Sequence, residues 1–236
     1  MKTRIGKEFI IGRIKKAINI KKDYLNTLKN ERYHIHVQEG NSKTGINCRT
    51  VSLISGHDCQ NCKACIHDCY DINNIMYIPA VQNDRARNSA LHKFNIDWYW
   101  EDIETDIKEN FITQLRVNVG GDSTYDDFVH IEQICIRNPR CNILLFTKNY
   151  KDINRFLDER NGVKPDNMKV MWSRWRGLES NNKWNLPEAH VLFENGETTA
   201  PEFGAYYCKG NCSECFFYDE GCWSLKNGES VIFKEH

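Results

Sequence analysis

Residues 114–149, QLRVNVGGDSTYDDFVHIEQICIRNPRCNILLFTKN, contain the alternation that decides the fold. The apolar run at 114–122 predicts a buried strand that ends in a Gly–Gly turn, and residues 126–138 have the apolar spacing of a helix. A second apolar run at 141–149 predicts the next strand. Because strands alternate here with a helix of about 10–15 residues, the segment predicts βαβ units and a parallel sheet.

The same alternation extends in both directions along the chain. Helical patterns cover 84–110 and 150–160, and the second of these stops at Asn161-Gly162, a typical helix end. Further strands are expected at 33–38, 51–56, 168–175, 189–194 and 231–236. We therefore expect an α/β protein built on a parallel sheet.

Three parts of the chain differ in composition. Residues 1–32 hold ten lysines and arginines against three acidic residues, and their helical apolar spacing predicts a basic amphipathic arm. Residues 33–200 carry the alternating strands and helices and form the main domain. Residues 201–236 are rich in Gly, Cys and aromatic residues. They have few apolar residues to pack alone, so we expect metal to organise this segment against the main domain.

The distribution of charged residues limits the classes of partner that the protein can bind. The arm at 1–32 predicts either a contact with nucleic acid or a host protein, or a solvated helix packed on the body. The whole chain has 32 basic and 32 acidic residues, which excludes a global basic field. No stretch reaches the length of a membrane span, and the charged N-terminus does not match a signal peptide. We expect a cytoplasmic protein with no membrane partner.

Eleven cysteines stand out, and eight of them fall in two tight runs. An odd count in a reducing compartment does not fit a disulfide framework, whereas clustered thiolates usually hold metal. The first run, CQNCKACIHDCY, has the spacing C-x2-C-x2-C-x3-C. This is the run of bacterial ferredoxins, except that Tyr70 replaces the usual proline. Its predicted metal ligands are Cys59, Cys62, Cys65 and Cys69.

The second run, CKGNCSECFFYDEGC, has the spacing C-x3-C-x2-C-x6-C. Its predicted ligands are Cys208, Cys212, Cys215 and Cys222. One or two iron–sulfur clusters, of the 4Fe-4S type, are expected, with zinc as the alternative. The two runs can share ligands, so the number of clusters and the ligand partition stay open. Cys135 and Cys141 are expected to be small buried residues. Cys48 lies near the first run, where it could serve as a spare ligand, but we expect it to be buried as well.

Several short motifs resemble those of the phage gene-product-88 family. They are GNSKTG (40–45), LRVNVGGD (115–122), FTKNY (146–150), PDNMKVMWSRW (165–175) and the terminal Cys run. The resemblance covers most of residues 40–236. It implies a protein of a phage or mobile element that acts in the host cytoplasm, and it implies little about activity.

The order of the parts is also similar, more distantly, to the radical SAM superfamily. In that family a cysteine loop follows the first strand of a partial (β/α) barrel, and a Gly–Gly–acid turn ends the second. Here VSLISG (51–56) precedes the first cysteine run, and Gly120, Gly121 and Asp122 end the next strong strand. The resemblance implies a partial (β/α) barrel-like fold and S-adenosylmethionine (SAM), whose amino group these three residues would meet.

The cysteine spacing departs from the radical SAM pattern. The family's C-x3-C-x2-C occurs only at Cys208, Cys212 and Cys215, far from the first strand. If four cysteines close the first cluster, no iron is left open for SAM. The alternative to SAM binding is a structural role, in which the Gly–Gly–Asp segment is a strand-to-helix turn with Asp122 or Ser123 as the helix N-cap.

Three further residues at predicted strand ends, Lys148, Ser173 and Arg174, are candidates to hold a carboxylate or phosphate group. The alternative is that they are surface residues beside loops. Two functions follow: a SAM-dependent radical enzyme with an unknown substrate, or a non-catalytic cluster- or zinc-stapled binding protein. Catalytic residues, substrate and oligomeric state stay open.

Overall fold

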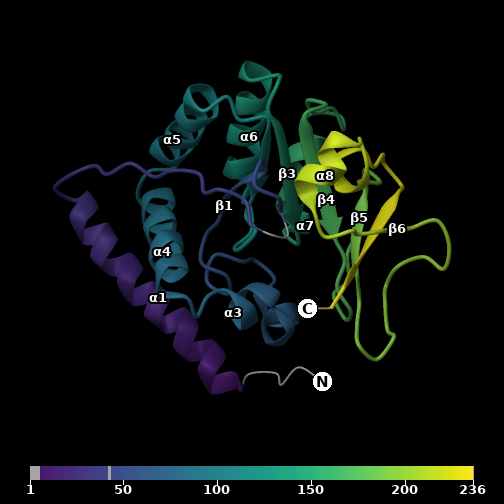
Figure 1. Ribbon diagram of the computed structural model, residues 1–236, viewed down its shortest axis with the longest axis horizontal. Helices are drawn as coiled ribbons and strands as arrows, with labels where there is room; N and C mark the ends of the chain where they lie inside the picture. The colour runs from purple at the N-terminus through teal and green to yellow at the C-terminus, as the bar shows by residue number, and fades with distance from the viewer. Residues whose placement is uncertain (1–5, 42–43, 236) are drawn as a thin grey trace.

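The computed structural model describes residues 6–41 and 44–235, which build one seven-stranded parallel sheet with helices packed around it (Figure 1). Residues 1–5 of the predicted basic arm, Ser42 and Lys43 of the GNSKTG motif, and residue 236 lie outside the described residues. The strand order is β1-β2-β3-β4-β5-β7-β6, and every neighbouring pair is parallel. The predicted α/β class and parallel sheet are therefore confirmed.

The helices and strands follow the predicted alternation, except that the strand expected at 51–56 lies at 49–51 and the helical pattern at 84–110 is divided between two helices. The strands are β1 (Arg49–Val51), β2 (Gln114–Val117), β3 (Asn142–Thr147), β4 (Met168–Ser173), β5 (Glu188–Leu192), β6 (Tyr206–Tyr207) and β7 (Ser230–Lys234). The α-helices are α1 (Lys7–Leu28), α2 (Cys62–Cys65), α3 (Tyr70–Asn74), α4 (Pro79–Phe94), α5 (Ile96–Glu109), α6 (Tyr125–Arg137), α7 (Tyr150–Asp158) and α8 (Cys212–Phe217). Two 3-10 helices, η1 (Ile66–Asp68) and η2 (Gly221–Trp223), lie within the cysteine runs.

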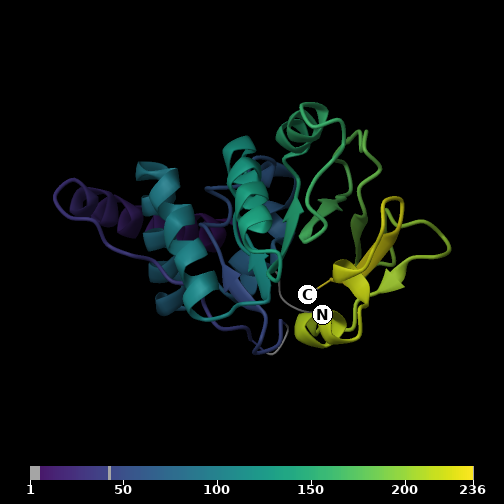
Figure 2. The same ribbon diagram turned by 90° about the horizontal axis from the view of Figure 1, so that it is seen from above.

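The sheet is open, with β1 and β6 at its two edges. Figure 2 shows α1, α4 and α5 at one end of the molecule and the Cys-rich C-terminal segment at the other. That segment contributes β6 and β7 to the sheet, so it is part of the fold as well as a metal-binding candidate. The barrel-like form of the sheet stays a prediction.

Both faces of the central strands are buried, which explains their nearly continuous apolar sequence. Because side chains alternate along a strand, odd and even positions of β3 face opposite ways. Ile143 and Leu145 join the core formed with α5, α6 and α7. Leu144 packs instead with Cys215 and Trp223 of the C-terminal segment. One face of the sheet therefore carries helices, and the other carries the second cysteine run.

The predicted arm is a helix packed on the body, because α1 lies along α4 (Figure 1). Its apolar residues Ile10, Ala17 and Leu28 are buried. Lys21 is buried with them, and its ammonium lies 3.0 Å from a carboxylate oxygen of Asp58. No helix in the described part of the chain is both long and apolar enough to cross a membrane.

Residues 33–38, which we expected to form a strand, stay outside the sheet except for one bridge between Gln38 and Thr50. Two carboxylates of α5 take the place of a neighbouring strand. Asp102 accepts from the backbone N–H of Ile35 at 2.9 Å, and Asp106 accepts from that of Val37 at 2.7 Å. The fit is geometric, because four residues of helix and two of extended chain both span about 6–7 Å.

The Gly–Gly–Asp turn after β2 packs directly on the chain that leaves β1. The Gly120 and Gly121 amides donate to the hydroxyls of Ser52 and Ser55 at 3.2 and 3.3 Å. Gly121 has φ +88°, and a Cβ there would lie 2.7 Å from the Cβ of Leu53. Asp122 is not the helix cap: Thr124 caps α6 through a capping box.

We predict that Gly121→Ala destabilises the protein by roughly 2–5 kcal/mol, because a left-handed backbone and an overpacked contact act together. Gly196→Ala is the matched control, since Gly196 has φ +84° but no atom within 4 Å of a built Cβ. It should cost only about 1–2 kcal/mol. Denaturant unfolding measures both values, and equal losses would show that the contact with Leu53 is unimportant.

Candidate metal centres

The four cysteines of the first run line one pocket at the carboxyl ends of the parallel strands. This pocket, the first cysteine pocket, has a volume of about 160 Å³ and is lined by Cys59, Cys62, Cys65 and Cys69. The chain after β1 supplies these cysteines: Cys59 precedes α2, Cys62 and Cys65 lie on α2, and Cys69 is the N-cap residue of α3. The ends of β2, β3 and β4 supply the opposite wall. This is the edge at which parallel sheets commonly bind ligands.

Backbone groups already approach the sulfurs of this pocket. The Gly56 N–H donates to Cys59 Sγ at 3.4 Å, and the Ile72 amide bonds to Cys69. Burial nevertheless raises the pKa of the Cys59 thiol well above its usual value and that of Cys69 to about 11. A bound cation is the usual means by which such thiols become thiolates.

The polar wall of the pocket contains three predicted residues, Asp122, Lys148 and Ser173. Lys148 Nζ donates to Ser173 Oγ at 2.9 Å and lies 5.2 Å from the Trp175 ring centre. Asp122 is buried, and burial raises its pKa to about 6 although Thr147, Lys148 and Ser123 donate hydrogen bonds to it. The pocket therefore presents a carboxyl group and an ammonium group beside the cysteines.

Two predicted site residues are placed differently. Gly120 is not among the described residues that line the pocket. A Cβ at this position would lie 2.6 Å from Arg85 Nη1 and 2.8 Å from Ser55 Oγ. Arg174 turns away and forms a two-pronged ion pair with Glu188, at 2.7 and 2.9 Å. Gly121 lines the pocket as predicted. Gly120 therefore allows Arg85 and Ser55 to pack closely against the backbone, and Arg174 links the end of β4 to β5.

The second run forms its own pocket on the face of the sheet opposite α6 and α7. Cys208, Cys212, Cys215 and Cys222 line it, together with Tyr206 and Trp223. Its volume is about 20 Å³, enough for a group the size of one water molecule. The first cysteine pocket has room for a larger group. The two runs therefore differ in what they can enclose.

Cys48 is buried as predicted, but it contacts the second run rather than the first. Its thiol hydrogen-bonds to Cys212. The loop before it is fixed to α8, because the Ser213 amide and hydroxyl both donate to the Thr44 carbonyl, at 2.9 and 3.1 Å. The second site therefore has five neighbouring thiols rather than four.

Arg116 of β2 lies between the two sites. Its Nη1 is 3.6 Å from Cys212 Sγ, and its Cζ is 5.0 Å from the ring centre of Phe146. Arg116 and Phe146 line both pockets, so a single layer of side chains separates them. The hydrogen bond from Cys48, followed by the charge of Arg116, lowers the pKa of Cys212 to about 6.

No group of three or more His, Cys, Asp or Glu side chains within residues 6–41 and 44–235 is placed to hold a single metal ion. The cysteines are free thiols. The metal assignment of both runs thus stays a prediction that rests on the donor set and on the shared pockets.

Sequence reasoning missed several residues of the two sites. Arg116 was detectable in principle, because a charge inside an apolar strand must face something polar. The buried ion pair of Arg85 with Asp71, beside Cys59 and Cys69, left no local signal. No local signal linked Cys48 to the second run either, because it is 164 residues away from Cys212 in sequence (212 − 48).

These features define a class: an open parallel α/β protein with thiol-rich pockets at the carboxyl edge and on one face of its sheet. The chain belongs to the phage Gene product 88 family, which matches it over residues 22–198. The first resemblance is thereby confirmed, and no comparison supports the link to the radical SAM superfamily. No curated protein and no solved structure matches the chain.

We predict that, in metal-free protein, Cys212 is the thiol alkylated fastest near pH 6.5, because thiolate rather than thiol reacts and its pKa is about 6. Cys48→Ala should slow this reaction at least several-fold by raising the pKa of Cys212. Cys135→Ala, which removes a buried cysteine of the helical core, is the control and should leave the rate unchanged. Iodoacetamide labelling across pH, mapped by mass spectrometry, gives the rates; uniform labelling of all eight clustered thiols would contradict the prediction.

Proposed function

We propose that this protein is an iron–sulfur protein whose cluster is held by Cys59, Cys62, Cys65 and Cys69. The observation that carries the proposal is that all four line one pocket with a polar opposite wall. Four thiols fit a cluster in chemistry, because each cysteine of a 4Fe-4S centre binds a separate iron. When bound, such a cluster supplies one-electron chemistry.

Charge around the pocket supports this assignment. Thiolates on a cluster are anionic, and their charge is favourable only where cations lie close. Arg85 is buried, and burial lowers the pKa of its guanidinium to about 10. The negative charges of Cys69 and Cys59 oppose part of this lowering. On the other side of the pocket, the positive charge of Lys148 opposes the rise in pKa that burial causes at Cys65 and Cys69. Two cations therefore flank the proposed ligands.

The second run supports a different metal role. Its pocket is small, and it joins α8 and η2 to the loop that carries Cys48. A structural zinc ion has four thiolate or imidazole ligands and needs no space beyond them. We propose zinc, or a second cluster with shared ligands, as a staple that holds residues 201–236 on the sheet.

The polar wall supports a small ligand beside the cluster, and SAM is the candidate that we propose. Asp122 offers a carboxylate for an ammonium group, and Lys148 with Ser173 offers donors for a carboxylate. Both Asp122 oxygens already accept backbone N–H groups, from Ser123 at 2.8 Å and Lys148 at 2.9 Å. With the hydrogen bond from Thr147, three of the roughly four acceptor positions of this carboxylate are used, which leaves one for the ligand.

The alternative is a non-catalytic cluster protein with a binding or regulatory role. It is favoured by the four thiols of the first run, because four ligands leave no iron open. The two functions share the cluster and differ in whether a small molecule binds beside it.

We predict that protein purified without oxygen contains iron and sulfide in equal amounts and absorbs broadly near 400 nm, as expected for iron–sulfur centres. A Cys62→Ala, Cys65→Ala double variant should lose at least half of the iron. A Cys135→Ala, Cys141→Ala variant, which alters buried core cysteines, should retain it. Zinc without iron in colourless protein would overturn the cluster proposal and favour a zinc-stapled binding protein.

For the reconstituted protein we predict SAM binding that weakens at least tenfold in Lys148→Met and Asp122→Asn. Arg174→Met is the control, because Arg174 is paired with Glu188 away from the pocket. Isothermal titration measures the affinity, and electron paramagnetic resonance of the reduced protein reports whether SAM lies beside the cluster. A cluster that binds no SAM would leave the non-catalytic function.

A further inference from the structure

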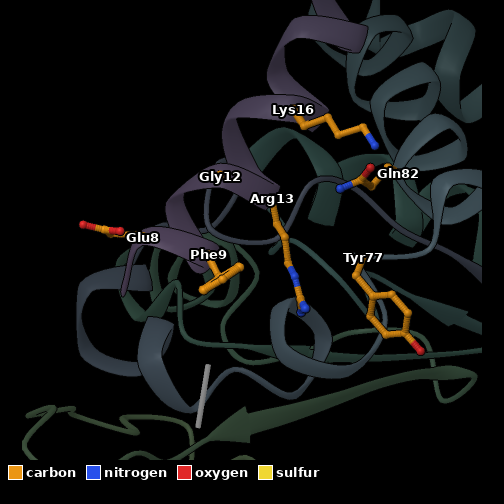
Figure 3. A pocket seen from close by; sticks show the side chains of 7 residues that line it. All are labelled: Glu8, Phe9, Gly12, Arg13, Lys16, Tyr77 and Gln82. Carbon is orange, nitrogen blue, oxygen red and sulfur yellow. The ribbon is translucent and has the colours of Figure 1, made fainter. Parts of the chain in front are cut away.

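A separate pocket, the α1 pocket, lies between α1 and the chain that joins α3 to α4 (Figure 3). Its wall includes Phe9, Arg13 and Lys16 from α1, Tyr77 from the connecting chain and Gln82 from α4. Its volume is about 390 Å³, within the range of small-ligand sites. No cysteine is among its described lining residues, so it is a different pocket from the two that the cysteine runs line.

Gly12 lines this pocket and has no structural reason to be glycine. It lies inside α1, and a Cβ built on it meets no atom within 4 Å. Glycine inside a helix is unfavourable because the unfolded chain gains entropy from it. The absence of a side chain at this position leaves more space in the α1 pocket for a ligand.

Gln82, on the inner wall, is unfavourable in a second way. Its side chain is almost entirely buried, and its Oε1 has no hydrogen-bond partner among the described residues. Burying an unpaired polar oxygen destabilises a fold, and an apolar residue of similar size would avoid this. Two locally unfavourable residues thus line one pocket. Such conflicts in natural proteins concentrate at functional sites.

The charged groups of the pocket favour an anion. Arg13 Nη1 donates to the carbonyls of Ile72 and Asn73 at 2.6 and 2.8 Å, which holds its guanidinium in place. Lys16 is exposed and has no acceptor in the described part of the chain. Figure 3 shows both side chains on the pocket side of α1. Glu8 also lines the pocket, but its carboxylate points away from Arg13 and Lys16.

The aromatic groups favour a flat ring. Phe9 is 69% exposed and Tyr77 is 56% exposed, so both rings are available to a ligand. Arg13 Cζ lies 5.2 Å from the Tyr77 ring centre, between the two rings in Figure 3. Aromatic rings beside cations are the arrangement by which proteins bind bases and their phosphates.

We propose that the α1 pocket binds a nucleotide. Lys16 and Arg13 would receive the phosphate, Phe9 or Tyr77 would stack on the base, and the Gln82 carboxamide would hydrogen-bond to its polar edge. A free nucleoside monophosphate and one unit of a single strand share this chemistry. The site goes beyond the proposed metal function and does not depend on it.

Fluorescence anisotropy of fluorescein-labelled dT12 with the full chain tests the proposal. Lys16→Ala should weaken binding at least fivefold. Lys22→Ala, an exposed lysine of the same helix outside the pocket, should change it less than twofold. AMP and TMP compete in a second arm: displacement at micromolar levels assigns a free nucleotide, and displacement by oligonucleotide alone assigns a strand.

Two further variants separate binding from folding. Gly12→Ala and Gln82→Met should each raise Tm by about 2–4 °C, because they remove an unfavourable residue, and should each weaken dT12 or nucleotide binding at least fivefold. The proposal is overturned if neither probe binds, if Lys16→Ala and Lys22→Ala are equivalent, or if inorganic phosphate competes as well as the nucleotides. Unchanged binding in both stabilised variants would overturn it as well.

Discussion

The hydrogen bonds of Asp58, the residue just before the first cysteine, hold the architecture of this protein together. Its carboxylate accepts from the buried Lys21 of α1 at 3.0 Å and from the Ile54 amide after β1 at 3.0 Å, and it also bonds to Ser89 of α4. Its carbonyl accepts from the Asp122 amide after β2 at 2.8 Å. One residue therefore joins α1, α4 and the ends of two strands where the cysteine loop begins. Because a buried lysine without its partner is strongly destabilising, the position of the cysteine loop is coupled to the stability of the whole fold.

The parallel sheet also decides how the two cysteine runs relate to each other. All its carboxyl ends meet at one edge, so the first run, the Gly–Gly–Asp turn and Lys148 converge although they are far apart in sequence. Alternation along β2 and β3 turns Arg116 and Phe146 toward the face that carries the second run. The same two side chains thus border both sites. The charge of Arg116 favours the thiolate form of the second run, at Cys212 and Cys222.

The α1 pocket and the cysteine pockets present different chemistry. The cysteine pockets are bordered by thiols, backbone turns and ion pairs, such as the Arg85–Asp71 pair. The α1 pocket combines Gly12, which has no packing role, with Gln82, whose side-chain oxygen is unpaired. A fold that keeps such residues gives up stability for them, which favours a ligand-binding role for α1 beyond covering α4.

The sequence alone determined the α/β class, the parallel sheet and the helices over 126–138 and 150–160, because periodicity and local turn residues encode them. It also determined that thiols cluster, and it singled out Gly121, Asp122, Lys148 and Ser173, since strand ends in a parallel sheet share one edge. Only the tertiary structure decided what depends on distant partners. Residues 33–38 have a strand pattern, but Asp102 and Asp106 hold them on α5 instead. Arg174 sits at a strand end, but Glu188 turns it away from the pocket. Cys48 lies next to Cys212 because the chain folds residues 44–48 onto α8, a contact that no local pattern encodes.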